Sequence, residues 1–313
     1  MTEDHDIHRD GGRETDRRRF MGLLAAGTAA AVSQQTASAT PIVSVAAAAV
    51  AGSTDVPSAF DQMIKLRASL DPRPVYMWLV GKRYLLLPGG RSLPLCGMVN
   101  CSITRCTRKA PDAFDLLVHE YNYNTDFTTG QWRDELVMPV TGRAVPSPVG
   151  KGPPVRHEWR AAYAYQGSLA GAGEFPPEAI RKYGADAELT IDRKVHPGEV
   201  FGDEIAFTND WYLRVAPRQT NTKGWWVREL STVRGSLQAA RDPREVYVPS
   251  RTAYSIVYDV LPWMQLDDVG GTVLTTASGG KTTSAAELPE AIREIFMQRN
   301  PEALGDPERL LRE

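Results

Sequence analysis

A short stretch in the middle of the chain, LLVHEYNYNTD, carries the residue types that acid–base chemistry needs. If it forms a strand, its side chains alternate between two faces. One face then carries His119, Tyr121 and Tyr123, and an inward histidine with two phenols would give a pocket groups that exchange protons. If that row faces solvent instead, Glu120 and Asn122 line the interior. The candidate catalytic residues are therefore His119, Glu120, Tyr121 and Tyr123.

The cysteines and the other histidines lack the spacing of a metal site. Cys96, Cys101 and Cys106 recur every five residues. On a strand the same-face pair, Cys96 and Cys106, would lie ~33 Å apart, too far to share one ion. We therefore expect the cysteines to be buried small apolar residues, and we place His157 and His196 on the surface. We predict no metal site and no cofactor, because the motifs for nucleotides, iron–sulfur clusters and catalytic zinc are also absent.

The elements that must position these residues are mainly strands. Apolar and polar residues alternate over short stretches separated by turn residues, which is typical of antiparallel sheets. The predicted elements are a hairpin around Gly81-Lys82, the strands LPLCGMVNCSITRCT, FDLLVHEYNYNTDF, QWRDELVMPV, AELTIDRKVHPG, DEIAFTNDWYLRVAP, GWWVRELSTVRGSL, TAYSIVYDVLPWM and GTVLTTASGGKT, and helices at 59–70 and from Pro289 onward. This pattern predicts a mainly β fold: an antiparallel, calycin-like β-barrel or a closed sandwich, with a few peripheral helices including a C-terminal helix.

Composition argues against two classes of partner. The chain has 36 Lys+Arg and 38 Asp+Glu, and its formal net charge of −2 gives no electrostatic case for binding nucleic acid. No run of 18 apolar residues occurs, so we expect no stable membrane insertion of the mature chain. Seven Trp and eleven Tyr suit a β-rich core or an aromatic-lined pocket. The expected partner is a small organic ligand or substrate.

The N-terminal segment DRRRFMGLLAAGTAAAV has the parts of an export signal. Three arginines at 17–19 precede an apolar run at 21–32, and Ala-Ser-Ala at 37–39 forms a small-residue cleavage site. The apolar run is too short to span a bilayer, which needs ~20 residues. Arg17-Arg18 followed by Phe20 resembles a twin-arginine (Tat) signal, which implies a bacterial protein that contacts the Tat translocase during export.

The expected organisation has three parts. They are a signal peptide at 1–39, a linker at 40–58 and a single β-rich domain at 59–313. A second small-residue run, VAAAAVAG, also allows cleavage near Ala51. The expected localisation is periplasmic or secreted.

Several sequence blocks carry a resemblance to a known family. They are the twin-arginine start, LRASLDPRPVYMWLVGKRYLLLPG, HEYNYNTDFTTGQWRDELVMPVTGRAV, LPWMQLDD and ELPEAIREIFMQRNPE. Together they resemble an exported bacterial family known as domain of unknown function 1838, over nearly all of the chain after the signal. The resemblance implies a shared fold and export, and no reaction. Where the family has a His/Asn-bearing segment after its second Thr-Gly, this chain has SPVGKGPPV.

Aromatic residues in these blocks are candidates for the wall of a pocket. The LPWM block breaks a strand with a bulky aromatic residue directly after a proline, so Trp263 forms either a pocket wall or a corner plug. Asp126 belongs to the family pattern. The candidate pocket-lining residues are Trp78, Asp126, Trp132, Trp263 and Met264.

Three functions fit these observations. The first is a cofactor-independent lyase, isomerase or dehydratase that acts by acid–base chemistry on a small apolar or aromatic organic compound. The second is a non-catalytic periplasmic barrel that binds a small ligand, and the third is a metal- or haem-dependent oxidoreductase. The clustering of ionisable and aromatic residues on one predicted strand favours the enzyme without a cofactor, whereas only the export route favours the oxidoreductase.

Overall fold

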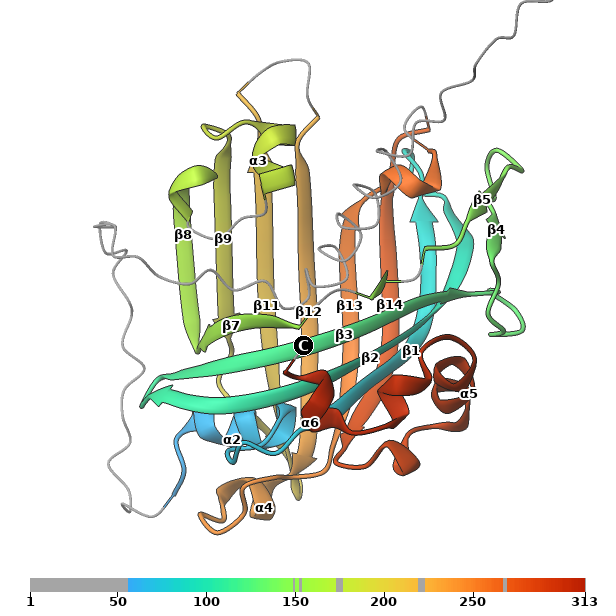
Figure 1. Ribbon diagram of the computed structural model, residues 1–313. Coiled ribbons are helices and arrows are strands. Elements are labelled where there is room, and N and C mark those ends of the chain that lie inside the picture. The colour runs from blue at the N-terminus through green and yellow to red at the C-terminus, as the bar shows by residue number, and fades with distance from the viewer. Residues whose placement is uncertain are drawn as a thin grey trace, which may run out of the picture.

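A long antiparallel sheet makes up most of the structure (Figure 1). The computed structural model describes residues 56–148, 150–151, 154–172, 177–218, 223–266 and 269–312. The predicted signal at 1–39 and most of the predicted linker at 40–58 lie outside these residues. The strands pair in the order β6-β3-β2-β1-β14-β13-β12-β11-β9-β8, with β7 on β3 and β10 on β11. Their bounds are β1 Val75–Leu86, β2 Ser92–Ala110, β3 Ala113–Thr125, β6 Gly150–Lys151, β7 Val155–Arg160, β8 Ala162–Ser168, β9 Glu188–Val195, β10 Glu199–Phe201, β11 Glu204–Ala216, β12 Trp225–Ser236, β13 Ser250–Asp259 and β14 Thr272–Thr282.

The sheet curls so that its two ends form crossing layers. In Figure 1, β2, β3 and β7 cross in front of the upright strands β8 to β14. β7 pairs with β3, and after Ala161 the next strand, β8, pairs with β9. Because the chain changes partner at Ala161, no ladder joins β8 directly to β3 in the described part of the chain. The predicted antiparallel, mainly β fold is confirmed, as a curled sheet that is not closed into a barrel.

Strand β1 is continuous, which corrects the predicted hairpin around Gly81-Lys82. Gly81 pairs with Met98 of β2 on one side and with Ala277 of β14 on the other. A Cβ atom at position 81 would lie 2.1 Å from the carbonyl oxygen of Thr276. Glycine is therefore needed here for the close approach of a neighbouring strand, and not for a turn.

Helix α2 (Ala59–Arg67) lies at the lower end of the curled sheet in Figure 1. It begins after Ser58, whose hydroxyl accepts a hydrogen bond from the Asp61 amide. Beyond its last turn, the buried Lys281 of β14 donates to the carbonyl oxygen of Ala68 at 2.5 Å. These contacts tie both ends of the helix, so Arg67 is held where its side chain enters the interior of the sheet.

The C-terminal helices cover the outer face of β1, β2 and β3 (Figure 1). They are α5 (Glu290–Arg299), the 3₁₀ turn η5 (Pro301–Leu304) and α6 (Pro307–Leu310). Helix α5 begins at Glu290, one residue after the predicted start at Pro289, and its completely buried Phe296 packs in the apolar cluster beneath it. The predicted C-terminal helix is therefore confirmed.

The remaining elements are short. They are β4 (Glu135–Val137) and β5 (Ala144–Pro146), which form a separate two-stranded sheet, helices α3 (Pro177–Tyr183) and α4 (Leu237–Arg241), and the 3₁₀ turns η2 (Ala170–Ala172), η3 (Pro262–Met264) and η4 (Ala285–Glu287). Among the described residues, no helix has both the length and the apolar composition needed to cross a membrane.

Candidate functional site

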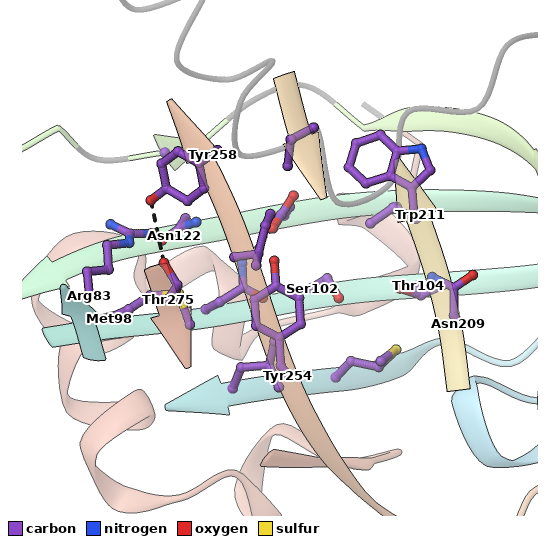
Figure 2. Close-up of a pocket in the computed structure, with 18 of the residues that line it drawn as sticks. Arg83, Met98, Ser102, Thr104, Asn122, Asn209, Trp211, Tyr254, Tyr258 and Thr275 are labelled. Atoms are coloured by element: carbon purple, nitrogen blue, oxygen red, sulfur yellow. Dashed lines mark hydrogen bonds between the residues drawn. The ribbon is translucent and has the colours of Figure 1, made fainter. Parts of the chain in front are cut away.

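A pocket of about 130 Å³ lies between the crossing layers of the sheet. Side chains from β1, β2 and β3 face it from one layer, and side chains from β9 and β11 to β14 face it from the other. Figure 2 labels lining residues from β1, β2, β3, β11, β13 and β14. Its apolar wall comes from two clusters, one with Leu116 and Trp159 and the other with Val227 and Trp263. Its polar lining residues are Arg67, Arg83, Asn100, Ser102, Thr104, Glu120, Asn122, Asn124, His157, Arg193, Asn209, Tyr254, Tyr258 and Thr275.

Strand β3 presents alternate residues to the pocket and to the outer face. Glu120 and Asn122 line the pocket. His119, Tyr121 and Tyr123 are buried on the opposite face, beneath the C-terminal helices. The predicted row of one histidine and two tyrosines thus faces neither the pocket nor solvent, because both sides of β3 are covered.

The outer row attaches the C-terminal helices to the sheet. The His119 ring stacks on the Tyr121 ring at a centroid distance of 4.7 Å, and the Tyr121 ring meets the edge of Phe296 at 5.1 Å. The Tyr123 hydroxyl donates to Oδ1 of Asn300 at 2.6 Å. Burial raises the pKa of the Tyr123 phenol well above its usual value. Of the four predicted catalytic residues, Glu120 is the one that reaches the pocket.

The η3 turn divides the two roles predicted for the LPWM block. Trp263 lines the pocket, as a wall residue. Met264 was also predicted to line the pocket, and this is wrong, because its side chain is completely buried and does not reach the pocket. The proline-initiated turn separates the two side chains because a 3₁₀ turn points successive residues in different directions.

Three other predicted wall residues lie outside the pocket. Trp78 belongs to the outer cluster beneath the C-terminal helices. Asp126 lies in the turn after β3, where it accepts a 2.7 Å hydrogen bond from the Thr129 amide, and this bond holds the pKa of the carboxyl below its usual value. The Trp132 ring is covered by the Arg299 guanidinium at 4.5 Å. All three have structural contacts that the sequence pattern did not distinguish from pocket contacts.

One row of inward-facing residues crosses the sheet from β9 to β1. The strand register places them side by side, in the order Arg193, Trp211, Glu229, Ile256, Thr275 and Arg83. Glu229 is 1% exposed and lies between two apolar neighbours. The buried carboxyl group of Glu229 therefore lies near the middle of the row, and the buried Arg193 and Arg83 lie at its two ends.

Arg67 and Arg193, called the arginine pair below, are two of the ionisable residues that line the pocket. Their guanidinium carbons lie 5.4 and 6.0 Å from the centroid of the Trp159 ring. Burial lowers the pKa of Arg193 to about 10, so it still carries its charge at neutral pH. Burial raises the pKa of Glu229, and the arginine pair and Ser231 act against this rise.

Arg83 lies at the other side of the pocket and has only amide partners among the described residues. Its guanidinium donates to the side-chain oxygens of Asn124 and, at 3.1 Å, of Asn122. Nearby, the hydroxyl groups of Tyr258 and Thr275 lie 3.5 Å apart, as the dashed line in Figure 2 shows. This side is rich in neutral hydrogen-bonding groups.

Glu120 and Tyr254 face the pocket from opposite layers. The Asn100 side chain donates to Oε1 of Glu120 at 2.5 Å and so fixes the orientation of the carboxyl group. Burial raises the pKa of Tyr254 well above its usual value, and the negative charges of Glu229 and Glu120 raise it further. Tyr254 therefore stays protonated at neutral pH and can donate a hydrogen bond or a proton.

His157 is buried and lines the pocket, which corrects its predicted surface position. It lies on β7 opposite Leu116 of β3. Within this strand His157 and Trp159 face inward, whereas Arg156 is exposed. In RHEWR, the inward-facing His157 and Trp159 alternate with charged residues. Because three of the five residues are charged, the segment was predicted to lie on the surface.

Several buried polar atoms of the lining have no hydrogen-bond partner among the described residues. They are Nε1 of Trp211, Trp225 and Trp263, Oδ1 of Asn209, and Nε of Arg83 and Arg193. Buried polar atoms without partners are rare in folded proteins. Their convergence on one pocket gives it donors and an acceptor for a polar ligand.

The sequence analysis missed the arginine pair, Glu229 and Tyr254. A signal for two of them was present, because a charged residue in phase with the apolar residues of its own strand has to be buried. Glu229 is in phase with Val227, and Arg193 is in phase with Ile191. Arg67 gives no such signal, since it ends a helix.

Within the described ranges, no group of three or more His, Cys, Asp or Glu side chains is arranged to hold a metal ion. No protein-family model matches this chain, and no match was found among the curated proteins. The resemblance to family 1838 stays a prediction from the blocks quoted above.

Proposed function

We propose that this chain is an exported enzyme that converts a small organic compound in the pocket by acid–base chemistry, as a lyase, isomerase or dehydratase that needs no cofactor. The observation that carries the proposal is the pair Glu120 and Tyr254, which face one pocket from opposite layers. A carboxylate and a protonated phenol are a base and an acid, and each can contribute roughly 10²–10⁴-fold to a rate.

The proposed roles follow from the surroundings of each group. Glu120, oriented by Asn100, takes a proton from a carbon atom of the substrate. The electron pair of the broken C–H bond forms or shifts a C=C bond. In an elimination, the bond between the neighbouring carbon and the leaving group breaks, and Tyr254 protonates that group; in an isomerisation, Tyr254 protonates the far carbon of the shifted bond. The raised pKa of Tyr254 keeps its proton in place until then. The indole walls of Trp211 and Trp263 keep water from the reacting atoms.

The test starts from the substrate pool of the native host. Purified protein is incubated with a small-molecule extract, and mass spectrometry identifies a compound that is consumed and the product that replaces it. With that compound, Glu120→Gln and Tyr254→Phe are expected to lower kcat by about 10²–10⁴-fold. Tyr123→Phe makes the same chemical change on the outer face of β3 and is expected to leave kcat unchanged.

The alternative function is non-catalytic binding of the small ligand. It is favoured by the indole N–H groups of Trp211 and Trp263, which have no hydrogen-bond partner among the described residues and suit a ligand that is held and released. A compound that binds the wild-type protein and is recovered chemically unchanged, with no turnover of any compound in the extract, would replace the enzyme proposal with this one.

Export through the Tat translocase to the periplasm or beyond is part of the proposal. Its support is the order of the N-terminal segment, from Arg17-Arg18 through the short apolar run to the small-residue cleavage site. The resemblance to an exported family adds to it.

A further inference from the structure

The arginines of the pocket differ from those of the outer surface in their partners. Exposed arginines are commonly paired with carboxylates, as Arg251 is with Glu204 at 2.5 Å. In the described part of the chain, neither member of the arginine pair forms a hydrogen bond or a salt bridge, although Arg193 is only 7% exposed. A buried guanidinium without an anionic partner is costly. This cost indicates that the partner is supplied from outside the chain.

The arginine pair places two like charges at one ring, since both guanidinium carbons lie within 6.0 Å of the Trp159 centroid. The charge of Arg67 adds to the effect of burial in lowering the pKa of Arg193. The carboxyl group that acts on both is Glu229, whose own charged form is disfavoured by burial. The site therefore carries excess positive charge, which an anion would neutralise.

The rest of the wall determines what kind of anion fits. Trp211 is the cross-strand neighbour of Arg193, so an anionic group on Arg193 directs the remainder of the ligand along an indole surface. The pocket volume of about 130 Å³ is close to the ~150 Å³ of a cavity that accepts one benzene ring. Inorganic phosphate or sulfate would leave the indole walls of Trp211 and Trp263 without contacts.

We propose that the ligand of this pocket is an organic carboxylate with a single ring or a body of similar size. The arginine pair holds its carboxylate beside Trp159, and Arg193 supplies the two-pronged hydrogen bonding that suits a carboxylate. The inference takes the pocket of the proposed function as its site and names the class of compound that enters it.

The test measures binding alone, with benzoate, benzamide and inorganic phosphate as probes, by calorimetry on the full-length protein. Benzoate is expected to bind at least tenfold more tightly than benzamide, which has the same shape without the charge, and than phosphate. Arg193→Gln is expected to weaken benzoate binding at least tenfold and to leave benzamide binding within twofold. Arg251→Gln, which removes an exposed arginine, is expected to change neither.

Two results would overturn the inference. Equal affinity for benzoate and benzamide would show that the pocket does not select an anion. Phosphate binding as tight as benzoate binding would show that the pocket does not select an organic carboxylate. If Arg193→Gln unfolds, Arg193→Lys and Arg67→Gln take its place, and benzoate binding unchanged in both folded variants counts against the proposal. Because no turnover is measured, loss of activity in the Glu120 or Tyr254 variants tests the proposed reaction separately.

Discussion

Glu229 is the residue at which burial and charge oppose each other most directly. It is 1% exposed on the inner face of β12, and the groups that influence its pKa are Arg67, Arg193, Ser231 and Tyr254. Burial dominates and raises the pKa above the usual 4.5. Protonation of this group therefore favours the folded state, even though two arginines are near.

The first prediction concerns the stability that Glu229 contributes at different pH values. With the folded pKa above the unfolded one, the contribution is fully present below about pH 4.5 and is lost as the pH rises through the folded pKa. Glu229→Gln should therefore gain stability relative to wild type between pH 4.5 and 8, by at most about 1.4 kcal/mol per pH unit. Urea unfolding across this range measures the difference.

The matched control is Glu188→Gln, which removes a glutamate from an exposed position of β9. A free-energy difference between wild type and Glu229→Gln that stays flat from pH 4.5 to 8 would contradict the raised pKa. The difference between the free energies of unfolding of the two variants removes the pH dependence that they share, which comes from all the other carboxyl groups.

The two faces of strand β3 have different contacts, which separate residues that anchor the C-terminal helices from residues with a proposed function in the pocket. Its outer residues hold the C-terminal helices, chiefly through Phe296, which meets the rings of Tyr121 at 5.1 Å and of Tyr123 at 6.0 Å. Its inner residues line the pocket. Changes on one face should therefore affect folding, and changes on the other should affect ligand binding.

Helix α5 offers a direct test of this separation. Phe296→Ala should lower the free energy of unfolding by about 3–5 kcal/mol, because Phe296 is completely buried. Its neighbour Met297 is 60% exposed, and Met297→Ala should change stability by less than about 0.5 kcal/mol. Denaturant titration measures both. A Phe296→Ala variant as stable as Met297→Ala would mean that the C-terminal helices are not anchored as described.

The sequence predicted the elements better than it predicted the site. Alternation identified β3, β13 and β14, and the proline at 289 marked the start of α5 to within one residue. The alternation of β3 also correctly placed Glu120 on the face opposite His119 and the two tyrosines. It could not show which face lines the pocket, because the outer face is buried by helices that come from residues near the C-terminus. The hairpin at Gly81 failed for a related reason, since the contact that requires glycine comes from β14.

At the scale of the whole molecule, the cysteines bear on where folding can occur. All three are free and buried, as predicted, and each belongs to a different apolar cluster. The fold therefore does not depend on a disulfide bond and can form in a reducing compartment. This property suits the proposed Tat route, which carries folded proteins.

Replacing Arg17-Arg18 by two lysines tests that route in the whole protein. The variant is expected to accumulate uncleaved in the cytoplasm, with its pocket formed, because the Tat receptor no longer reads the signal. Cell fractionation and mass spectrometry of the N-terminus measure location and cleavage. Normal export and processing of the variant would argue for a different route.

The pairing of β1 with β14 delays completion of the sheet during synthesis. Tyr76 and Thr282 are partners across this ladder, and the row that ends at Arg83 continues through Thr275 of β14. Strand pairs that are distant in sequence form slowly. The proposed N-terminal signal would leave the ribosome long before the last strand exists, so a chain exported with its pocket formed would have to cross the membrane after translation ends.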